Sequence, residues 1–215
     1  MKLCTPKSKI YYDWIHILDF YKKVVREQDT VLEIGASNKK RTIDLSKHCK
    51  KLIGVECFPE RTLEDFNNIK YINGDWQKLT DFIPKNSIDV AVSSHVIEHV
   101  KDDLTAINQL YTVLKPGGTA IINTPNRRRL TQKTIELFTG ERKFPYWEHV
   151  REYIEDDLIE LILNSKFKDN FEIHPVVFGL HGGPIFIFIE KPPKKIRHLS
   201  NFWQIHLFKQ KTGFY

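Results

Sequence analysis

Short apolar runs alternate with helical segments along most of this chain, and this alternation limits the possible fold more than any other feature. The runs are rich in β-branched residues, while the segments between them repeat apolar residues every three or four positions. The expected strands are 30–34, 51–56, 70–72, 87–94 and 119–123. The expected helices are 10–26, 41–49, 60–66 and 102–114. Strands separated by helices are typical of a parallel sheet built from right-handed βαβ units, so we expect an α/β fold.

The chain beyond Pro125 is expected to cover this sheet and to complete it. Residues 126–151 combine an arginine run with Gly140 and Pro145, and we interpret them as a cap inserted over the sheet. A helix is expected over 154–165, and two strands, 171–179 and 185–191, are expected to form an antiparallel end of the sheet. Two prolines close this unit, so the sequence predicts one domain over 1–192 followed by a tail, 193–215.

Positive charge is concentrated at the C-terminal end. The net charge is +6, and residues 191–215 carry six Lys or Arg and no acid, so the other 27 basic residues balance the 27 acidic ones. A neutral body argues against an evenly basic nucleic-acid-binding surface. Apolar residues recur every third position from Ile196 to Phe208, as in a helix with one apolar stripe. Such a basic, aromatic tail suits an anionic membrane surface, the body of the protein or a second subunit in a homodimer, and these alternatives stay open.

The N-terminal sequence and the cysteines indicate the compartment. The first residues lack the apolar stretch of a secretory signal, and no apolar run approaches the roughly 20 residues of a membrane span. Cys4, Cys49 and Cys57 are odd in number and form no Cys-x-x-Cys pair. We therefore expect a cytoplasmic protein without disulfides or structural zinc.

Polar residues follow every expected strand, where an open α/β sheet binds its ligands. The first strand ends in Glu33-Ile34-Gly35-Ala36-Ser37, without the glycine-rich turn that lets backbone approach a pyrophosphate. Glu56 ends the second strand, where a carboxylate can accept both hydroxyls of a ribose. The sequence thus indicates a ligand with a ribose and no pyrophosphate, which disfavours NAD.

Several segments carry a resemblance to a known family. They are VLEIGAS, GVE, NGDW, SSHVIEHV, LKPGGTAIINTPN and WEHVREYIEDDL, within residues 29–190. The chain resembles the class I S-adenosylmethionine-dependent methyltransferases, especially the branch with the ubiquinone-pathway O-methyltransferases. The resemblance implies a Rossmann-like, mostly parallel sheet of seven strands in the order 3-2-1-4-5-7-6, with strand seven antiparallel, and S-adenosyl-L-methionine as cofactor.

The resemblance also implies roles for individual residues. It puts Glu33, Gly35, Ala36 and Ser37 in the loop beside the methionine moiety and Glu56 on the ribose. It puts Asp75 and the Trp76 backbone at the adenine, and Ser94 near the sulfonium. This chain departs from the family at Ser37 and Lys39, where glycines are usual.

Histidines near the expected site suit proton transfer or metal binding. His95 and His149 are the candidate general bases, since imidazole accepts a proton near neutral pH. His95, Glu98 and His99 share one face of a helical turn, so they could hold a divalent metal; the alternative is that Glu98 and His99 support the framework, with no metal bound.

The expected function is methyl transfer from S-adenosylmethionine to an oxygen of a small-molecule or lipid-like acceptor. The basic residues around Arg127-Arg128-Arg129 could recognise an anionic group on that acceptor. Two alternatives are an RNA or protein methyltransferase and a binding module that has lost catalysis. Nucleic acid is disfavoured because the chain lacks an Asn/Asp-Pro-Pro-Tyr-type motif and an added RNA-binding domain.

Overall fold

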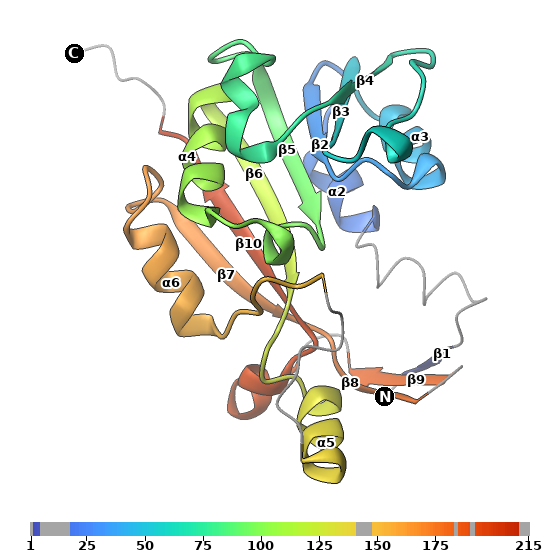
Figure 1. The fold of residues 1–215 in the computed structure, drawn as a ribbon, viewed down its shortest axis with the longest axis vertical. Coiled ribbons are helices and arrows are strands. Elements are labelled where there is room, and N and C mark those ends of the chain that lie inside the picture. Colours follow the sequence, from blue (N-terminus) through green and yellow to red (C-terminus); the bar gives the residue numbers. More distant parts are fainter. Residues whose placement is uncertain (1, 5–17, 141–147, 183–184, 190–191, 211–215) are drawn as a thin grey trace.

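A computed structural model describes residues 2–4, 18–140, 148–182, 185–189 and 192–210. Its main sheet has seven strands in the order β4-β3-β2-β5-β6-β10-β7 (Figure 1). The strands are β2 (Thr30–Ile34), β3 (Lys51–Glu56), β4 (Ile69–Asn73), β5 (Ile88–Ser94), β6 (Leu114–Pro125), β7 (Phe171–Val176) and β10 (Phe202–Phe208). Only β10 is antiparallel to both of its neighbours, β6 and β7. The predicted order 3-2-1-4-5-7-6, with strand seven antiparallel, is confirmed.

Helices cover both faces of this sheet. The α-helices are α2 (Leu18–Val24), α3 (Lys39–Ser46), α4 (Asp103–Val113), α5 (Leu130–Thr139) and α6 (Glu155–Leu163). Short 3-10 turns are η1 (Pro59–Arg61), η2 (Trp76–Asp81), η3 (Ile97–His99) and η4 (Lys194–Leu199). One apolar core lies against α4 and α6, and a second lies against α2 and α3. The predicted helix 10–26 is described only from Leu18, and its first part lies outside the described residues.

A second, three-stranded sheet extends from the body. It has the order β1-β9-β8, with β1 (Lys2–Cys4), β9 (Ile185–Ile189) and β8 (Phe178–Gly182). The prediction that 185–191 pairs with 171–179 within the main sheet is therefore wrong for β9. The chain leaves β7 at Val177, whose φ of 56° breaks the extended backbone, and β8 and β9 then pair with each other. These strands and α5 lie together beyond the end of β6 (Figure 1).

The seventh strand comes from the predicted tail. Phe202–Phe208 pairs with β6 along its whole length, so this segment belongs to the domain, and the predictions of a helix there and of a boundary at 192 are wrong. Trp203, Ile205 and Leu207 alternate into the core and are almost fully buried. Of the residues whose three-residue spacing had suggested a helix, only Ile205 belongs to this alternating set. Phe202 and Phe208 lie on the other face of the same strand, and Ile196 and Leu199 belong to η4. The basic turn η4 precedes the strand.

The helix predicted for 60–66 is the other clear difference. Only Pro59–Arg61 is helical, and Phe66 and Ile69 form an isolated antiparallel bridge before β4. No helix within the described part of the chain has the length and apolar content that crossing a membrane requires.

Candidate functional site

The carboxyl ends of three central strands meet at one edge of the sheet. Ile34 at the end of β2 pairs with Val55 of β3 and with Ser93 of β5. The residues that follow, among them Gly35, Glu56 and Ser94, therefore lie side by side. The structure thus brings together the strand-end residues that sequence reasoning selected for the cofactor.

The first loop turns sharply at Gly35, which has a φ of 77°. A Cβ there would lie 2.4 Å from Val96 Cγ2, so both the backbone angle and the packing require glycine. Asn38 then caps α3 by accepting a hydrogen bond from the Arg41 backbone N–H. Ser37 and Lys39 are exposed, so their side chains, at positions where the family usually has glycine, do not disturb the packed interior.

Glu33 and Arg41 form a buried ion pair under this loop. Arg41 Nε lies 2.7 Å from Glu33 Oε1, and Arg41 Nη2 donates to the Gly35 carbonyl at 3.0 Å. Burial by itself would lower the pKa of Arg41, but the Glu33 carboxylate outweighs it and raises that pKa. Glu33 Oε2 is buried and accepts no hydrogen bond from the described residues. An ammonium group would satisfy this oxygen.

Sequence reasoning missed Arg41. Its signal is a cation in the first turn of the helix that follows the glycine turn. This position is electrostatically unusual, since helix N-termini favour anions. The buried carboxylate of Glu33 explains why a cation is tolerated there.

Glu56 presents one carboxylate oxygen at the end of β3. The side chain is buried, and Oε1 accepts the Phe58 backbone N–H at 3.1 Å. Within the described residues no hydrogen bond reaches Oε2. That oxygen is suited to accept from a sugar hydroxyl.

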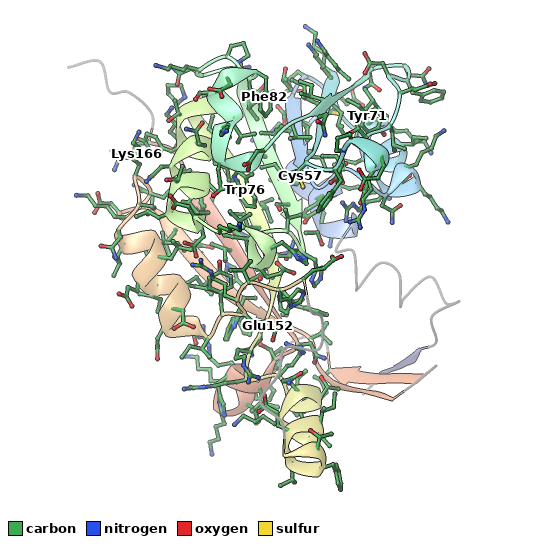
Figure 2. All side chains as sticks on the ribbon, in the orientation of Figure 1. Cys57, Tyr71, Trp76, Phe82, Glu152 and Lys166 are labelled. Atoms are coloured by element: carbon green, nitrogen blue, oxygen red, sulfur yellow. The ribbon has the colours of Figure 1, made fainter. Side chains whose placement is uncertain are left out.

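Asp75 and Trp76 follow β4, and their side chains already have structural roles. Asp75 caps η2 through the Gln77 backbone N–H at 2.8 Å, and both of its oxygens lie near Gln77 Nε2. Trp76 is a core residue with 3% of its surface exposed, and Figure 2 shows it among the other interior side chains. Only the backbone of Trp76 could therefore meet a ligand, as the resemblance implies.

His95 is held at the end of β5 in a left-handed conformation with a φ of 57°. Such an angle is uncommon for a non-glycine residue and often marks a functional position. The backbone N–H of His95 donates to the Asn123 carbonyl at 2.9 Å, which fixes the turn. The ring lies edge-on to Phe202, with 5.1 Å between centroids.

Glu98 lies beneath His95 and is fully buried. Its Oε1 is 3.4 Å from His95 Nδ1, and its Oε2 accepts a hydrogen bond from Thr124 Oγ1 at 3.1 Å. Glu98 Oε1 makes no hydrogen bond among the described residues, so the carboxylate would act on a protonated imidazole through its charge and leave Nε2 as the nitrogen that could exchange a proton. Nε2 is buried and has no hydrogen-bond partner among the described residues. We call this arrangement the His95–Glu98 pair.

His149 lies in a neighbouring buried network. Its Nδ1 lies 2.9 Å from Glu152 Oε1, and Arg129 contacts both oxygens of the same carboxylate. Burial by itself would raise the pKa of Glu152, but the hydrogen bonds from His149 and Arg129 outweigh it and lower the pKa. The segment that carries His149 is anchored to η3, where the Glu98 carbonyl accepts the backbone N–H groups of Val150 and Arg151.

The possible metal ligands group differently from the expectation. Glu98, His99 and His149 each offer a ligand atom within 4.8 Å of the others, and the rings of His99 and His149 are 4.8 Å apart. The predicted set of His95, Glu98 and His99 is thus replaced by a set in which His149 takes the place of His95. Helical spacing suggested the first set. The third member of the observed set, His149, comes from residues 148–153, which fold back against η3 and are called the returning segment.

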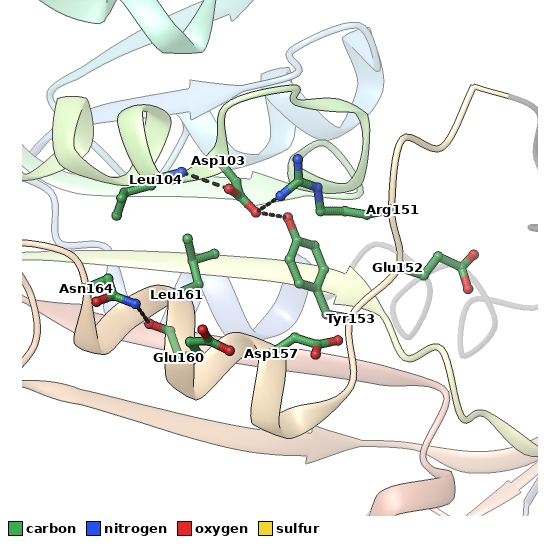
Figure 3. A pocket seen from close by; sticks show the side chains of 9 residues that line it. All are labelled: Asp103, Leu104, Arg151, Glu152, Tyr153, Asp157, Glu160, Leu161 and Asn164. Atoms are coloured by element: carbon green, nitrogen blue, oxygen red, sulfur yellow. Dashed lines mark hydrogen bonds and ion pairs between the residues drawn. The ribbon is translucent and has the colours of Figure 1, made fainter.

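A pocket of about 340 Å³ lies between α4 and α6 (Figure 3), and none of the strand-end residues selected for the cofactor lines it. At its rim Asp103 Oδ2 accepts hydrogen bonds from Arg151 Nη1 at 2.6 Å and from the Tyr153 hydroxyl at 2.9 Å. Burial and the Asp103 charge raise the pKa of Tyr153, so the hydroxyl remains a donor. Arg151 and Tyr153 therefore fasten the returning segment to the start of α4.

Comparisons with known proteins agree on one family. Residues 7–169 match the model of a methyltransferase domain. A probable S-adenosylmethionine-dependent methyltransferase of Mycolicibacterium smegmatis is 33% identical over 101 residues, which are 46% of this chain and 35% of that protein. Demethylmenaquinone methyltransferase of Staphylococcus saprophyticus is 31% identical over 112 residues, 45% of this chain and 47% of that protein. The chain thus matches from about a third to a half of the length of these curated relatives.

A solved structure supports the same fold. The N-methyltransferase NodS from Bradyrhizobium japonicum, determined with S-adenosyl-L-homocysteine, superposes with a TM-score of 0.59 at 16% identity. The alignment covers 95% of this chain and 89% of that one. With the family model matching most of the chain and the seven-stranded order in place, this chain belongs to the methyltransferase domain family, as its sequence motifs had indicated.

Proposed function

We propose that this chain transfers a methyl group from S-adenosylmethionine to an oxygen of a small, lipid-like acceptor. The observation that carries the proposal is the His95–Glu98 pair beside the strand-end site. A hydroxyl acceptor must lose its proton as it is methylated, and an oriented imidazole is suited to take that proton.

The cofactor would lie across the ends of β2, β3, β4 and β5. Glu33 Oε2 supports this placement, because a buried oxygen without a partner suits the amino group of the methionine moiety. Gly35, Ser37 and the backbone of Ala36, whose side chain is buried in the core, would line that moiety, and Glu56 would accept the ribose hydroxyls. Asp75 and the Trp76 backbone would border the adenine, and Ser94 would face the sulfur.

The bound cofactor supplies an electrophilic methyl group whose leaving group is a neutral thioether. The chain must align the acceptor, exclude water and move one proton, and alignment alone is worth effective molarities of about 10⁵–10⁸ M in favourable cases. An oxygen–carbon bond forms as the carbon–sulfur bond breaks, and the acceptor proton passes to His95 Nε2. Glu98 stabilises the resulting imidazolium through Nδ1. His149, held by Glu152, is proposed to border the acceptor from the returning segment.

Helix α5 supports an acceptor with an apolar body. Leu137 and Phe138 are 81% and 84% exposed, and Ile135 is half exposed. Arg128 and Lys133 are exposed cations on the same helix or at its start. Cations beside an apolar face suit a lipid with an anionic headgroup at a membrane surface, and α5 lies beyond the end of β6, on the acceptor side. This helix replaces the C-terminal tail as the candidate for peripheral membrane contact.

The test is to incubate the protein with methyl-labelled S-adenosylmethionine and fractionated cell extract. The proposal expects label in an organic-soluble or small-molecule fraction, in a linkage that mild base leaves intact, as an ether would. Label in RNA or protein would support the alternative methyltransferase classes and contradict this proposal. Absence of transfer in a protein that still binds S-adenosylhomocysteine would identify a binding module.

A further inference from the structure

A cluster of metal-binding side chains lies on the sheet face between β7 and β10. Glu172 and His174 are two residues apart on the edge strand β7, so they project from the same face. His206 of β10 is the cross-strand partner of Glu172. One ligand atom from each of the three lies within 4.8 Å of the others.

We propose that Glu172, His174 and His206 form a site for a divalent transition-metal ion of the zinc class. Two imidazoles and one carboxylate are a common donor set for zinc when a water completes the coordination. Glu172 and His174 are exposed and His206 is half-buried, so an ion can reach the cluster from solvent.

The side chains already converge as a metal site requires. His174 Nε2 lies 2.9 Å from Glu172 Oε2, and the two imidazole rings are 4.8 Å apart at 60°. Gln204 Oε1 lies 3.0 Å from His206 Nε2 and helps to orient that ring. An ion would take the place of the proton shared by His174 and Glu172, and small side-chain rotations would bring the three donors to about 2.0–2.2 Å from it.

This cluster is separate from the proposed methyl-transfer site. The alternate residues of the same strands, among them Phe171, Ile173, Trp203 and Ile205, pack on the core beneath α4 and α6. The cluster therefore lies on the opposite face. Phe202, which contacts His95, is four residues away along β10.

An ion here would link β7, at the edge of the sheet, to β10, which lies between β6 and β7. β10 is the last described strand in the sequence. Strand pairing and contacts between side chains hold it to β7. A ligand that binds only the folded state stabilises it by mass action. Zinc at about one hundred times its Kd should raise the melting temperature by roughly 5–10 °C.

The experiment is zinc titration of the full chain by calorimetry, with cobalt(II) absorption as a second readout of coordination geometry. The titration is run on the wild-type chain and on the His99→Ala variant, which removes one member of the second group of possible ligands found among the described residues. Adding His174→Gln should weaken zinc binding by at least about 10–100-fold, the loss that even outer contacts of metal sites produce. It should also abolish the zinc-dependent rise in melting temperature. The matched control is His198→Gln, which removes an exposed histidine outside the cluster.

Loss of one zinc equivalent with His174→Gln or His206→Gln, and none with His198→Gln, supports the site. Equal zinc binding and equal thermal shifts in all of these proteins contradict it. Circular dichroism of the metal-free variants checks that each is folded, and Glu172→Gln, on the exposed edge, offers a third variant with the least effect on packing.

Discussion

At the scale of single residues, the His95–Glu98 pair makes the most specific chemical prediction. Asparagine tolerates positive φ, so His95→Asn should keep the turn while it removes the proposed base. We expect kcat for the acceptor found by labelling to fall by about 10²–10⁴-fold. The Kd for S-adenosylhomocysteine should stay unchanged. His48→Asn, in the connection between α3 and β3, is the control.

Two further results would bear on the pair. Glu98→Gln should lower kcat as well, because the amide no longer stabilises the protonated imidazole. Full turnover in His95→Asn would show that another group, or no group, takes the acceptor proton.

Glu152 gives a prediction about acid stability. Its pKa is lower in the folded protein than in the unfolded chain, so the network with His149 and Arg129 stabilises the fold above the ordinary glutamate pKa of about 4.3. That contribution is lost as the pH falls through the lowered folded value. Glu152→Gln should cost about 3–5 kcal/mol at pH 7, since it leaves Arg129 buried beside a neutral partner.

Urea unfolding at pH 7 and at pH 3 measures this effect. The difference between wild type and Glu152→Gln should shrink at pH 3, because this pH lies below the ordinary glutamate pKa and the unfolded chain is then protonated at Glu152. Glu160→Gln, on the exposed side of α6, should show no such change. A pH-independent difference would contradict the assignment.

At the scale of elements, β10 decides whether the sheet is complete. Trp203 is almost fully buried between the β6 and β7 neighbours of its strand. Trp203→Ala should reduce the free energy of unfolding by about 3–5 kcal/mol, as expected for removing a buried aromatic residue. Phe208→Ala, at the exposed end of the same strand, should cost much less.

Removing residues 193–215 should be more severe, because it deletes the whole strand between β6 and β7. Cooperative unfolding monitored by circular dichroism should be lost in this truncated chain. A stable, folded truncation would contradict the position of β10 in the sheet.

Strand β10 is the part of the main sheet that could not be predicted from the sequence. The parallel part of the sheet could be predicted because β-branched runs and helical periodicities alternate there without ambiguity. Phe202–Phe208 fits a period of three as well as a period of two, and the surrounding residues 191–215, with six basic residues and no acid, resemble a tail. Only pairing with Thr119–Pro125, more than 70 residues away, selects the strand.

Prediction of the site residues from the sequence had the same limit, because it too could not identify long-range contacts. That Glu33, Glu56 and Ser94 lie at neighbouring strand ends could be predicted because strand ends are visible in the sequence, and their roles toward the cofactor stay predictions. Arg41 and the placement of His149 beside Glu98 could not, because they depend on a buried ion pair and on a returning segment. Local spacing carries no information about such long-range contacts.

At the scale of the whole molecule, α5 and the three-stranded sheet extend the domain beyond the end of β6, where we propose that the acceptor binds. Leu137→Ser/Phe138→Ser should leave the free energy of unfolding within about 0.5 kcal/mol, because both side chains are exposed. Cosedimentation with anionic vesicles should fall sharply in this variant. Equal vesicle binding by variant and wild type would remove α5 from the acceptor surface, and Thr139→Ser is the conservative control on the same helix.

Calorimetry with S-adenosylhomocysteine tests whether the ends of β2, β3, β4 and β5 hold the cofactor. Wild type should bind one equivalent. Glu56→Ala should bind more weakly by about 1.5–3 kcal/mol, the cost of losing a charge-assisted contact to the ribose. Glu60→Ala, an exposed glutamate four residues on, should bind like wild type. No binding by the wild-type protein, or equal binding by Glu56→Ala, would contradict the account.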